Sequence, residues 1–382
     1  MKAVGLITEY NPFHNGHIYH IQKAKVETGA DVVVAVMSGN FVQRGIPAVA
    51  DKWTRAKYAL ENGVDIVIEL PIYFALQPAH IFANGAVKLL NDMGVSQIVF
   101  GAENPETDFF NLVENAPEED GDSNFDEKNQ TFASSFAQSL EEATGFKLEG
   151  ANDILAFSYA KAIVDLGLKD KIDLIPIKRQ SAEYHDLELE KDTKIASATA
   201  IRKAIDEGTD VSPFTPMTEI SNRNYEEKMF ELLYYRIATD GVKQLKQVYQ
   251  MNEGLEYRIK DVVDNGVKSY QELVENVKSK RFTTARIHRI LTYTLLNIKV
   301  DQMQAAIKEP YLRLLGFTKN GQLYLNEIKK QIDLPFITHV DLKTASKTLR
   351  LDYKAGQVYN QIMGHSEPQD VGRIPLNLSE DK

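Results

Sequence analysis

Residues 6–17 of the chain are Leu6-Ile7-Thr8-Glu9-Tyr10-Asn11-Pro12-Phe13-His14-Asn15-Gly16-His17. The apolar start predicts a short buried strand that Asn11-Pro12 ends, and a helical pattern begins within a turn of His17. The first turn of a helix carries unpaired N–H groups and partial positive charge, which favour phosphate. We therefore predict an ATP site on this strand-to-helix turn. There His14 and His17 hold charge on the transferring phosphates, and Gly16 lets the phosphates approach the backbone.

Two ordinary turn histidines would give the same short H-x-G-H match. The position of the match, after the first predicted strand and before the first predicted helix, favours the nucleotide site. We expect both imidazoles to lie on a surface turn.

The composition indicates a soluble globular protein. The chain has 382 residues, enough for two domains, with 43% hydrophobic and 26% charged residues. It has no Cys, which excludes disulfides, cysteine-ligated zinc and thiol catalysis. No apolar run reaches the roughly 20 residues of a membrane helix, and the first residues lack the pattern of a signal peptide. We expect a cytoplasmic enzyme that does not bind membranes.

The charge is distributed unevenly between the two halves of the chain. The net charge is −10 overall, but residues 216–382 carry 25 Lys and Arg against 21 Asp and Glu. Residues 276–354 are more basic still, with 15 basic and 6 acidic residues. Such asymmetry indicates that the second half binds a polyanion.

The first half alternates apolar strands with amphipathic helices. This pattern predicts an α/β fold with a Rossmann-like parallel sheet and helices on both faces. The predicted strands are Ala3–Thr8, Asp31–Met37, Asp65–Glu69, Gln97–Gly101 and Lys171–Ile177. The predicted helices between them are Gly16–Thr28, Asp51–Glu61, Ala79–Asp92 and Asp153–Asp165, with another after Ser197. Ligands of such sheets bind beyond the carboxyl ends of the strands.

The second half has the 3.6-residue period of helices. The predicted helices are Tyr225–Thr239, Gly241–Tyr249, Leu255–Asn265, Ser269–Val277, Thr283–Ile298 and Gln322–Ile332. We therefore predict a catalytic ATP-binding domain over residues 1–215 and an appended, mostly α-helical, basic domain over residues 216–382.

Residues 103–127 contain ten acidic residues and no Lys or Arg. With Pro105, Pro117 and Gly121 this composition predicts a solvated excursion rather than a metal-binding loop. No metal site is predicted in the chain.

A second phosphate-binding segment follows the fifth predicted strand, at Lys194-Ile195-Ala196-Ser197-Ala198-Thr199-Ala200-Ile201-Arg202. Ser197 and Thr199 offer hydroxyl and N–H groups at a helix start, and Arg202 projects from its first turn. Alone, the segment fits an ordinary serine N-cap with a surface arginine. Together with the histidine turn at the same sheet edge, it favours phosphate binding.

Residues 276–300 contain six basic residues and no acidic residue. Arg286 and Arg289 are three apart on a predicted helix and share a face. A solvated face is the ordinary explanation of such a run. The absence of any Asp or Glu favours contact with a nucleic-acid backbone, through Lys280, Arg281, Arg286 and Arg289.

The motifs H-x-G-H and S-x-T-x-I-R resemble those of the nucleotidylyltransferase superfamily. Longer segments resemble the tRNA(Met) cytidine acetate ligase family: Glu9 to His17, Ser38-Gly39-Asn40-Phe41-Val42-Gln43-Arg44-Gly45, Asp51-Lys52-Trp53-Thr54-Arg55-Ala56 and residues 63–71. Shorter matches continue through Phe100-Gly101-Ala102-Glu103, Asn152-Asp153-Ile154-Leu155, Lys178-Arg179 and Leu315-Gly316-Phe317. The resemblance implies an enzyme that uses acetate and ATP, with Mg²⁺ carried by ATP, to make N4-acetylcytidine at the wobble position of elongator tRNA(Met). It implies an acetyl-adenylate intermediate, with release of AMP and pyrophosphate.

The resemblance also implies which residues bind ATP. Carried over by motif, they are Ile7, Thr8, Glu9, Tyr10, Asn11, Pro12, Phe13, His14, Asn15, Gly16, His17, Ile18, Tyr19, His20, Gly101, Asn152 and Arg179. Ile46, Pro78, His80 and Ala151 depart from the expected pattern.

The residues around Asp51 and Lys52 allow two interpretations. Asp51 is either a helix cap or part of the site, and Lys52 is either a solvated first-turn residue or, with Arg44, a cation at the α-phosphate or acyl group. We assign Lys52 a catalytic role beside His14 and His17, and we expect Trp53 in the core.

Two rival functions remain open at this point. A coenzyme-type adenylyltransferase would share the ATP site but would leave the basic second half unexplained. A non-catalytic tRNA-binding protein could retain the site as a nucleotide sensor.

Overall fold

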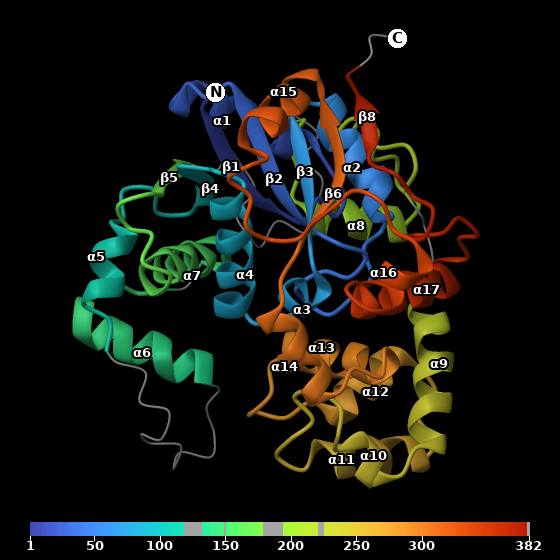
Figure 1. Cartoon of the computed structure of the whole chain (residues 1–382). Helices are drawn as coiled ribbons and strands as arrows, with labels where there is room; N and C mark the ends of the chain where they lie inside the picture. The colour runs from blue at the N-terminus through green and yellow to red at the C-terminus, as the bar shows by residue number, and fades with distance from the viewer. Residues whose placement is uncertain (118–131, 149, 179–193, 221–224, 380–382) are drawn as a thin grey trace.

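The architecture is a central sheet with helices on both faces and a helical region to one side (Figure 1). The computed structural model describes residues 1–117, 132–148, 150–178, 194–220 and 225–379. No helix among these residues is long and apolar enough to cross a membrane.

Five parallel strands form the core of the sheet, as the alternating sequence pattern predicts. They are β1 (Ala3–Thr8), β2 (Val32–Ser38), β3 (Ile66–Leu70), β4 (Gln97–Ala102) and β5 (Asp173–Lys178). The strand order is β5-β4-β1-β2-β3, so the chain reverses direction across the sheet between β1 and β4. In open α/β sheets such a reversal opens a crevice at the carboxyl ends of the strands. The histidine turn leaves β1 at that edge.

Both faces of the sheet are buried, which explains why its strands are continuous apolar runs. Val34 and Val36 of β2 face the core shared with the helices of one side, and Val33 and Ala35 face the core of the other. The first face carries α3 (Ile72–Ala75), α4 (Ala79–Asp92) and α7 (Ala151–Asp165), and the second carries α1 (Asn15–Thr28) and α2 (Lys52–Glu61).

The segment 103–117 contains regular secondary structure. It contains helix α5 (Phe109–Glu114), and helix α6 (Phe132–Thr144) follows at a distance in the sequence. The predicted acidic excursion lies partly outside the described residues.

The second half is largely helical and packs against the first. Its helices are α9 (Tyr225–Thr239), α10 (Val242–Leu245), α11 (Leu255–Asp264), α12 (Tyr270–Val277), α13 (Thr284–Leu295) and α14 (Val300–Lys308). Buried residues of these helices join the same apolar core as α4 and α7. The predicted helix Gly241–Tyr249 is much shorter in the structure. Figure 1 shows that α13 is placed at the side of this group that faces the sheet.

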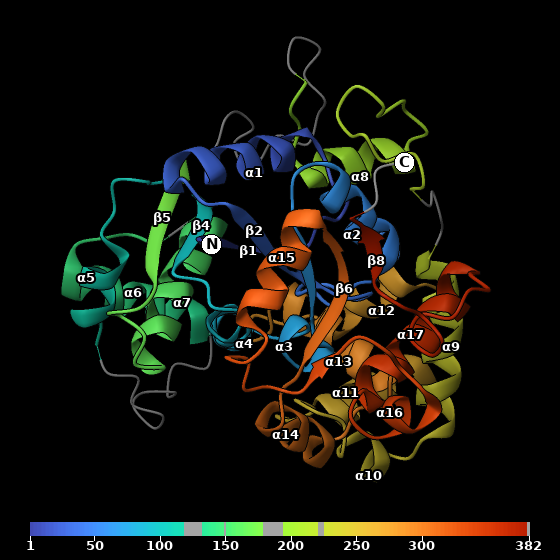
Figure 2. The same cartoon turned by 45° about the horizontal axis from the view of Figure 1, so that its top comes forward.

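The chain then returns to the sheet, which the sequence pattern did not predict. Strand β6 (Leu312–Thr318) pairs antiparallel with β3 and is followed by α15 (Lys319–Ile328), β7 (Phe336–Ile337), α16 (Leu342–Ser346), α17 (Arg350–Met363) and β8 (Leu376–Leu378). Strands β7 and β8 both pair with β6. Figure 2 shows α15 crossing in front of the sheet beside β6, with β4 and β5 at the opposite end. The fold class is confirmed, and the boundary near residue 215 stays a prediction.

Candidate functional site

A cavity of about 500 Å³ opens at the carboxyl edge of the sheet. It is lined by the residues that follow β1, by the ends of β4 and β5, and by the first turns of α7 and α8 (Ala198–Asp206). Residues of the loop after β2, the start of α4 and helix α13 complete the wall. The cavity therefore lies at the strand reversal, where the fold predicts a ligand site.

The histidine turn is an N-terminal cap built from imidazoles. His14 is the N-cap residue of α1, and its Nδ1 accepts a hydrogen bond from Gly16 N at 3.1 Å. His17 Nδ1 accepts one from His14 N, also at 3.1 Å, which makes the reciprocal pattern of a capping box. Because both Nδ1 atoms are acceptors, each neutral imidazole carries its proton on Nε2. Nε2 is then the atom that can donate to an anion.

The two rings are held tightly against each other and against the core. Their centroids lie 3.7 Å apart, and the His17 ring meets Tyr10 edge-on at 4.8 Å. His14 is buried, so the expectation of a surface turn is wrong for this residue. Gly16 has a steric reason to be glycine, because a Cβ there would lie 2.8 Å from His14 Cε1.

The second phosphate-binding segment meets the histidine turn directly. Ser197 caps α8, its hydroxyl accepting from Ala200 N at 3.0 Å, so the simple N-cap interpretation also holds. Arg202 donates from Nη1 to Asn11 O at 2.6 Å and from Nη2 to Thr199 Oγ1 at 3.1 Å. Burial, together with the nearby charge of Arg44, lowers the pKa of Arg202. Ser197, Thr199 and Arg202 thus line the same cavity as His14 and His17.

The β4 side of the cavity is organised by a reciprocal carboxylate pair. Glu103 accepts hydrogen bonds from Asn152 Nδ2 at 2.6 Å and from Asp153 N at 2.8 Å, while Asp153 accepts from Glu103 N at 2.9 Å. Burial alone would raise the pKa of Glu103, but these hydrogen bonds outweigh it and lower the pKa. The pair fixes Asn152 beside Gly101 at the cavity wall.

Most of the residues assigned to ATP by resemblance reach the cavity. Those that line it are Ile7, Thr8, Glu9, Tyr10, Asn11, His14, Gly16, His17, Tyr19, His20, Gly101 and Asn152. Pro12, Phe13, Asn15 and Ile18 do not. Phe13 lies in the core, and Asn15 donates from Nδ2 to Lys194 O and Pro213 O, which anchors both flanks of α8. Arg179 lies outside the described residues.

Arg55 organises the loops of the site and was missed by the sequence analysis. Its buried guanidinium donates to Glu9 O at 2.6 Å, Ser38 O at 3.0 Å, Ala50 O at 2.9 Å and also to Gly39 O. These carbonyls follow β1 and β2, so one side chain holds the backbone of both strand ends. The available signal was its spacing of three and four residues from Tyr58 and Ala59, which places Arg55 near the inward face of α2.

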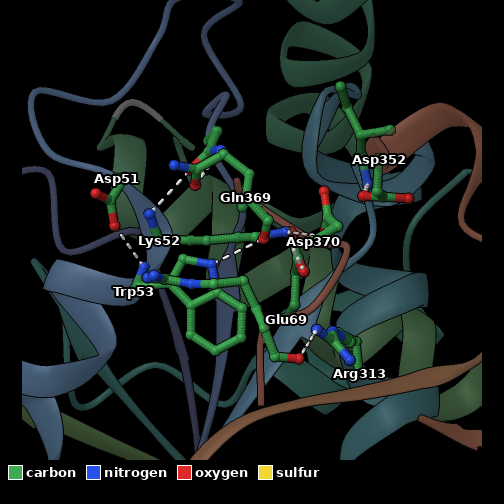
Figure 3. A network of polar contacts seen from close by, with 12 residues as sticks. Asp51, Lys52, Trp53, Glu69, Arg313, Asp352, Gln369 and Asp370 are labelled. Carbon is green, nitrogen blue, oxygen red and sulfur yellow. Dashed lines mark hydrogen bonds and ion pairs between the residues drawn. The ribbon is translucent and has the colours of Figure 1, made fainter. Parts of the chain in front are cut away.

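Lys52 does not line the cavity that His14 and His17 line, and its catalytic role stays a prediction. Its Nζ lies 2.8 Å from both oxygens of Glu69 and 2.7 Å from Asp370 Oδ1, and the side chain is 1% exposed (Figure 3). Burial alone would lower the pKa of Lys52, but Asp370 and Glu69 outweigh this effect and raise it. A cation paired with two buried carboxylates is placed to stabilise the fold.

Asp51 caps α2 through Trp53 N and Thr54 N, as the simpler interpretation predicts.

The basic stretch divides into residues that face outward and one that faces the cavity. Lys280 and Arg281 line a separate hollow of about 310 Å³ on the helical region. Arg286 pairs with Glu253 at 2.8 Å and stacks on Phe282. Arg289 is buried and lines the main cavity, whereas Arg286 is partly exposed, so the two do not lie together on a solvated face, and their contact with a nucleic-acid backbone stays a prediction. The close approach of α13 to the loop after β2 turns Arg289 inward.

Comparison with known proteins places this geometry in a family. A family model described as HIGH Nucleotidyl Transferase matches residues 1–373. A tRNA(Met) cytidine acetate ligase of Oenococcus oeni is 56% identical over 376 residues, covering 98% of this chain and 100% of that protein. One of Leuconostoc citreum is 55% identical over 392 residues, covering 100% and 98% respectively. The crystal structure of Thermotoga maritima TmcAL bound with α-thio ATP has a TM-score of 0.85 at 30% identity, and 100% of each chain is covered.

Replacing Lys52 tests whether its side chain stabilises the fold. Lys52→Met leaves Glu69 and Asp370 buried without their cation, and we expect the free energy of unfolding to fall by about 3–5 kcal/mol. Lys57→Met on the same helix is the matched control, because Lys57 is largely exposed and its partner Glu219 lies 3.8 Å away. We expect little change there. A Lys52→Met protein that unfolds like the parent but loses activity would support the catalytic assignment.

The buried carboxyl of Asp352, near Glu69 and Lys52, should make the stability of the fold depend on pH. It accepts from Ile72 N and Tyr311 Oη, and burial followed by the charge of Glu69 raises its pKa from 3.8 to about 7. Between these two values the folded state keeps a proton that the unfolded state has lost, so stability should fall as the pH rises through this range. Asp352→Asn mimics the protonated acid and should lose this part of the slope. Denaturant unfolding at several pH values in this range measures the stability of both proteins. The prediction is contradicted if the stability of the parent and of Asp352→Asn changes with pH in the same way.

Proposed function

The chain belongs to the HIGH nucleotidyl transferase family, among relatives named tRNA(Met) cytidine acetate ligase, and we propose that it is an ATP-dependent ligase that acetylates a cytidine of elongator tRNA(Met). The observation that carries the proposal is the meeting of two phosphate-binding segments, the histidine turn and the start of α8, in one cavity. The α-thio ATP complex of a relative with this fold supports a nucleotide as occupant.

The proposed reaction has two steps. A carboxylate oxygen of acetate attacks the α-phosphorus of ATP, forming acetyl-adenylate as the bond to the departing pyrophosphate breaks. The exocyclic amine of the cytidine then attacks the acetyl carbonyl, loses a proton, and releases AMP. The names of the relatives support a cytidine of tRNA(Met) as the acceptor. In this proposal the acceptor is the wobble cytidine, as the resemblance to the family implies.

The chain's part in the first step is positioning and charge stabilisation. The imidazoles of His14 and His17 present Nε2–H donors, and their Nδ1 atoms are occupied by backbone N–H groups. These backbone hydrogen bonds hold each imidazole in one tautomer. The N-termini of α1 and α8 add backbone dipoles to the same site.

The charge of the cavity suits a polyphosphate. Arg44, Lys178 and Arg202 line it, and Glu9 is the one carboxylate among its described residues. Mg²⁺ enters this proposal as the cation that ATP carries and brings into the site. It would neutralise charge on the phosphates. The proposed compartment is the cytoplasm, where ATP and tRNA are available.

The exposed cations before α13 supply the proposed tRNA surface. Lys280 and Arg281 are exposed and lie beside Phe282 in the hollow of the helical region. Neutralising such residues should weaken binding of any polyanion and reduce its salt dependence.

The imidazoles can be removed without removing the caps they form. Serine at an N-cap and glutamine at the N3 position make the ordinary capping box, so His14→Ser and His17→Gln should keep the start of α1 intact. Each should lower acetate-dependent ATP–pyrophosphate exchange by roughly two orders of magnitude, because a donor to the transition state is lost. His14→Ala, which also loses the cap, should in addition be about 1 kcal/mol less stable.

Melting curves and exchange rates together separate the two roles of the histidines. Parent-like exchange in folded His14→Ser would remove the proposed electrostatic role. Exchange that needs no acid substrate would favour a coenzyme-type adenylyltransferase, and nucleotide binding without exchange would favour a sensor.

The source of the acyl group provides a chemical test. Labelled acetate with ATP and methionine tRNA should place label on cytidine, with AMP and pyrophosphate formed in equal amounts. AMP is diagnostic, because attack at the γ-phosphate would instead give acetyl phosphate and ADP. Label that enters tRNA from acetyl-CoA, while acetate and ATP fail, would overturn the assignment.

A further inference from the structure

The cavity has an end that the nucleotide assignments leave unused. Its wall is formed by the loop after β2, the first turn of α4 and helix α13, with Val42, Ile46, Phe82, Ala285 and Arg289 as lining residues. None of these comes from the histidine turn, β4, α7 or α8. We call this wall the acceptor end.

The parts of the acceptor end are fixed to one another. Gly45 lies against the backbone of α13, where a Cβ would come within 2.3 Å of Arg289 N. Thr292 Oγ1 donates to Gly45 O at 2.8 Å, so the loop and the helix are also hydrogen-bonded. The hydroxyl of Tyr293 donates to Leu76 O, which ties α13 to the segment before α4. The helical region therefore contributes a rigid wall to the cavity.

Among the described residues, Arg289 is a buried cation without a carboxylate partner. Its side chain is 9% exposed, and its Nη1 donates to Gln43 O at a long 3.4 Å. Within the described residues its Nε has no hydrogen-bond partner, and no carboxylate forms an ion pair with it. Burial lowers its pKa, which is the expected response to missing counter-charge. Arg55 is more deeply buried, but its guanidinium is satisfied by four backbone carbonyls.

An anionic ligand in the cavity would supply what Arg289 lacks. Leaving a buried charge unpaired is costly, and such groups in native structures are normally paired or reserved for a ligand. A guanidinium presents parallel N–H groups that fit a phosphate or a carboxylate. The acceptor end is thus a built anion site.

We propose that Arg289 binds a backbone phosphate of the RNA nucleotide that accepts the acyl group. This inference rests on the proposed function and names the residue that holds its second substrate. Two observations select RNA rather than acetate or ATP as the source of the anion. The phosphates of ATP already have the histidine turn and α8, and α13 continues from the exposed cations Lys280 and Arg281.

The apolar residues of the acceptor end fit the rest of such a nucleotide. Val42, Ile46 and Ala285 surround the cavity beside Arg289 without offering a charge. An unpaired base splayed out of its stack is normally received by apolar or aromatic surface. A nucleotide held here would have its phosphate on α13 and its base toward the interior of the cavity.

Two substitutions separate this role from a structural one. Arg289→Met removes the charge and keeps most of the volume, and Arg289→Lys keeps the charge but loses the fork of N–H donors. If Arg289 serves a ligand, Arg289→Met should melt at the parent temperature or above it. A residue that holds the fold together would instead lower the melting temperature in both variants. Arg350→Gln, an exposed arginine on α17, is the matched control.

The two half-reactions then locate the anion. Acetate-dependent ATP–pyrophosphate exchange without RNA should keep its KM values for ATP and acetate within about twofold in Arg289→Met. Transfer from enzyme-bound acetyl-adenylate to methionine tRNA should need at least about tenfold more tRNA for half-maximal rate, with a salt slope smaller by about one. Arg289→Lys should recover part of this loss.

Each other outcome overturns the proposal. A raised KM for acetate would assign Arg289 to the acyl carboxylate, and a raised KM for ATP would assign it to the nucleotide. Unchanged transfer, or a lowered melting temperature with both half-reactions impaired alike, would leave it a structural residue. If the parent protein shows no exchange, the proposed function fails by itself. Titration of parent and Arg289→Met with labelled tRNA would then still decide whether Arg289 binds RNA.

Discussion

Two buried cations on one helix determine how the rest of the chain must be arranged. Helix α2 directs Lys52 and Arg55 into the interior, beneath the edge of the sheet where the cavity opens. Arg55 is stabilised by hydrogen bonds to backbone carbonyls at the ends of β1 and β2, which fixes the geometry of the loops around the site. Lys52 is neutralised by Glu69 of β3 and by Asp370, which lies 318 residues away in the sequence. An unpaired charge at either position would cost several kcal/mol. The fold is therefore complete only when the segment that carries Asp370 is packed against Lys52.

This requirement explains which elements the sequence could predict. Strands β1 to β5 and helices α1, α2, α4 and α7 are set by local periodicity, because each buries its own apolar face on its neighbour. Strand β6 is different, because its second residue is Arg313, which is fully buried beside Trp53. The same holds for α17, whose Asp352 faces inward to Ile72 and Tyr311. A local pattern treats such charges as exposed, since their partners lie far away in the sequence.

The candidate site also combines features set by local sequence with features set by distant contacts. The histidine turn and the Ser197 segment are local devices, each a strand or loop that leads into a helix, and they could be predicted from spacing alone. Arg289 could not be placed in this way. Its spacing from Arg286 gives two residues on one side of a helix, but it does not say whether that side meets water or the sheet. Gly45 decides this, because the absence of a side chain lets the α13 backbone come close enough to turn Arg289 into the cavity.

The position of α13 has a consequence for how the two proposed half-reactions are related. The helix is both a wall of the cavity and the continuation of the basic surface on the helical region. RNA phosphates that follow this surface would therefore reach the cavity along α13, beside the loop after β2. Acetyl-adenylate formed at the turn would meet its acceptor within the same cavity. The guanidinium of Arg289 and the imidazoles of His14 and His17 would then hold separate anions, so that binding of the second substrate does not require the first phosphate site to be vacated.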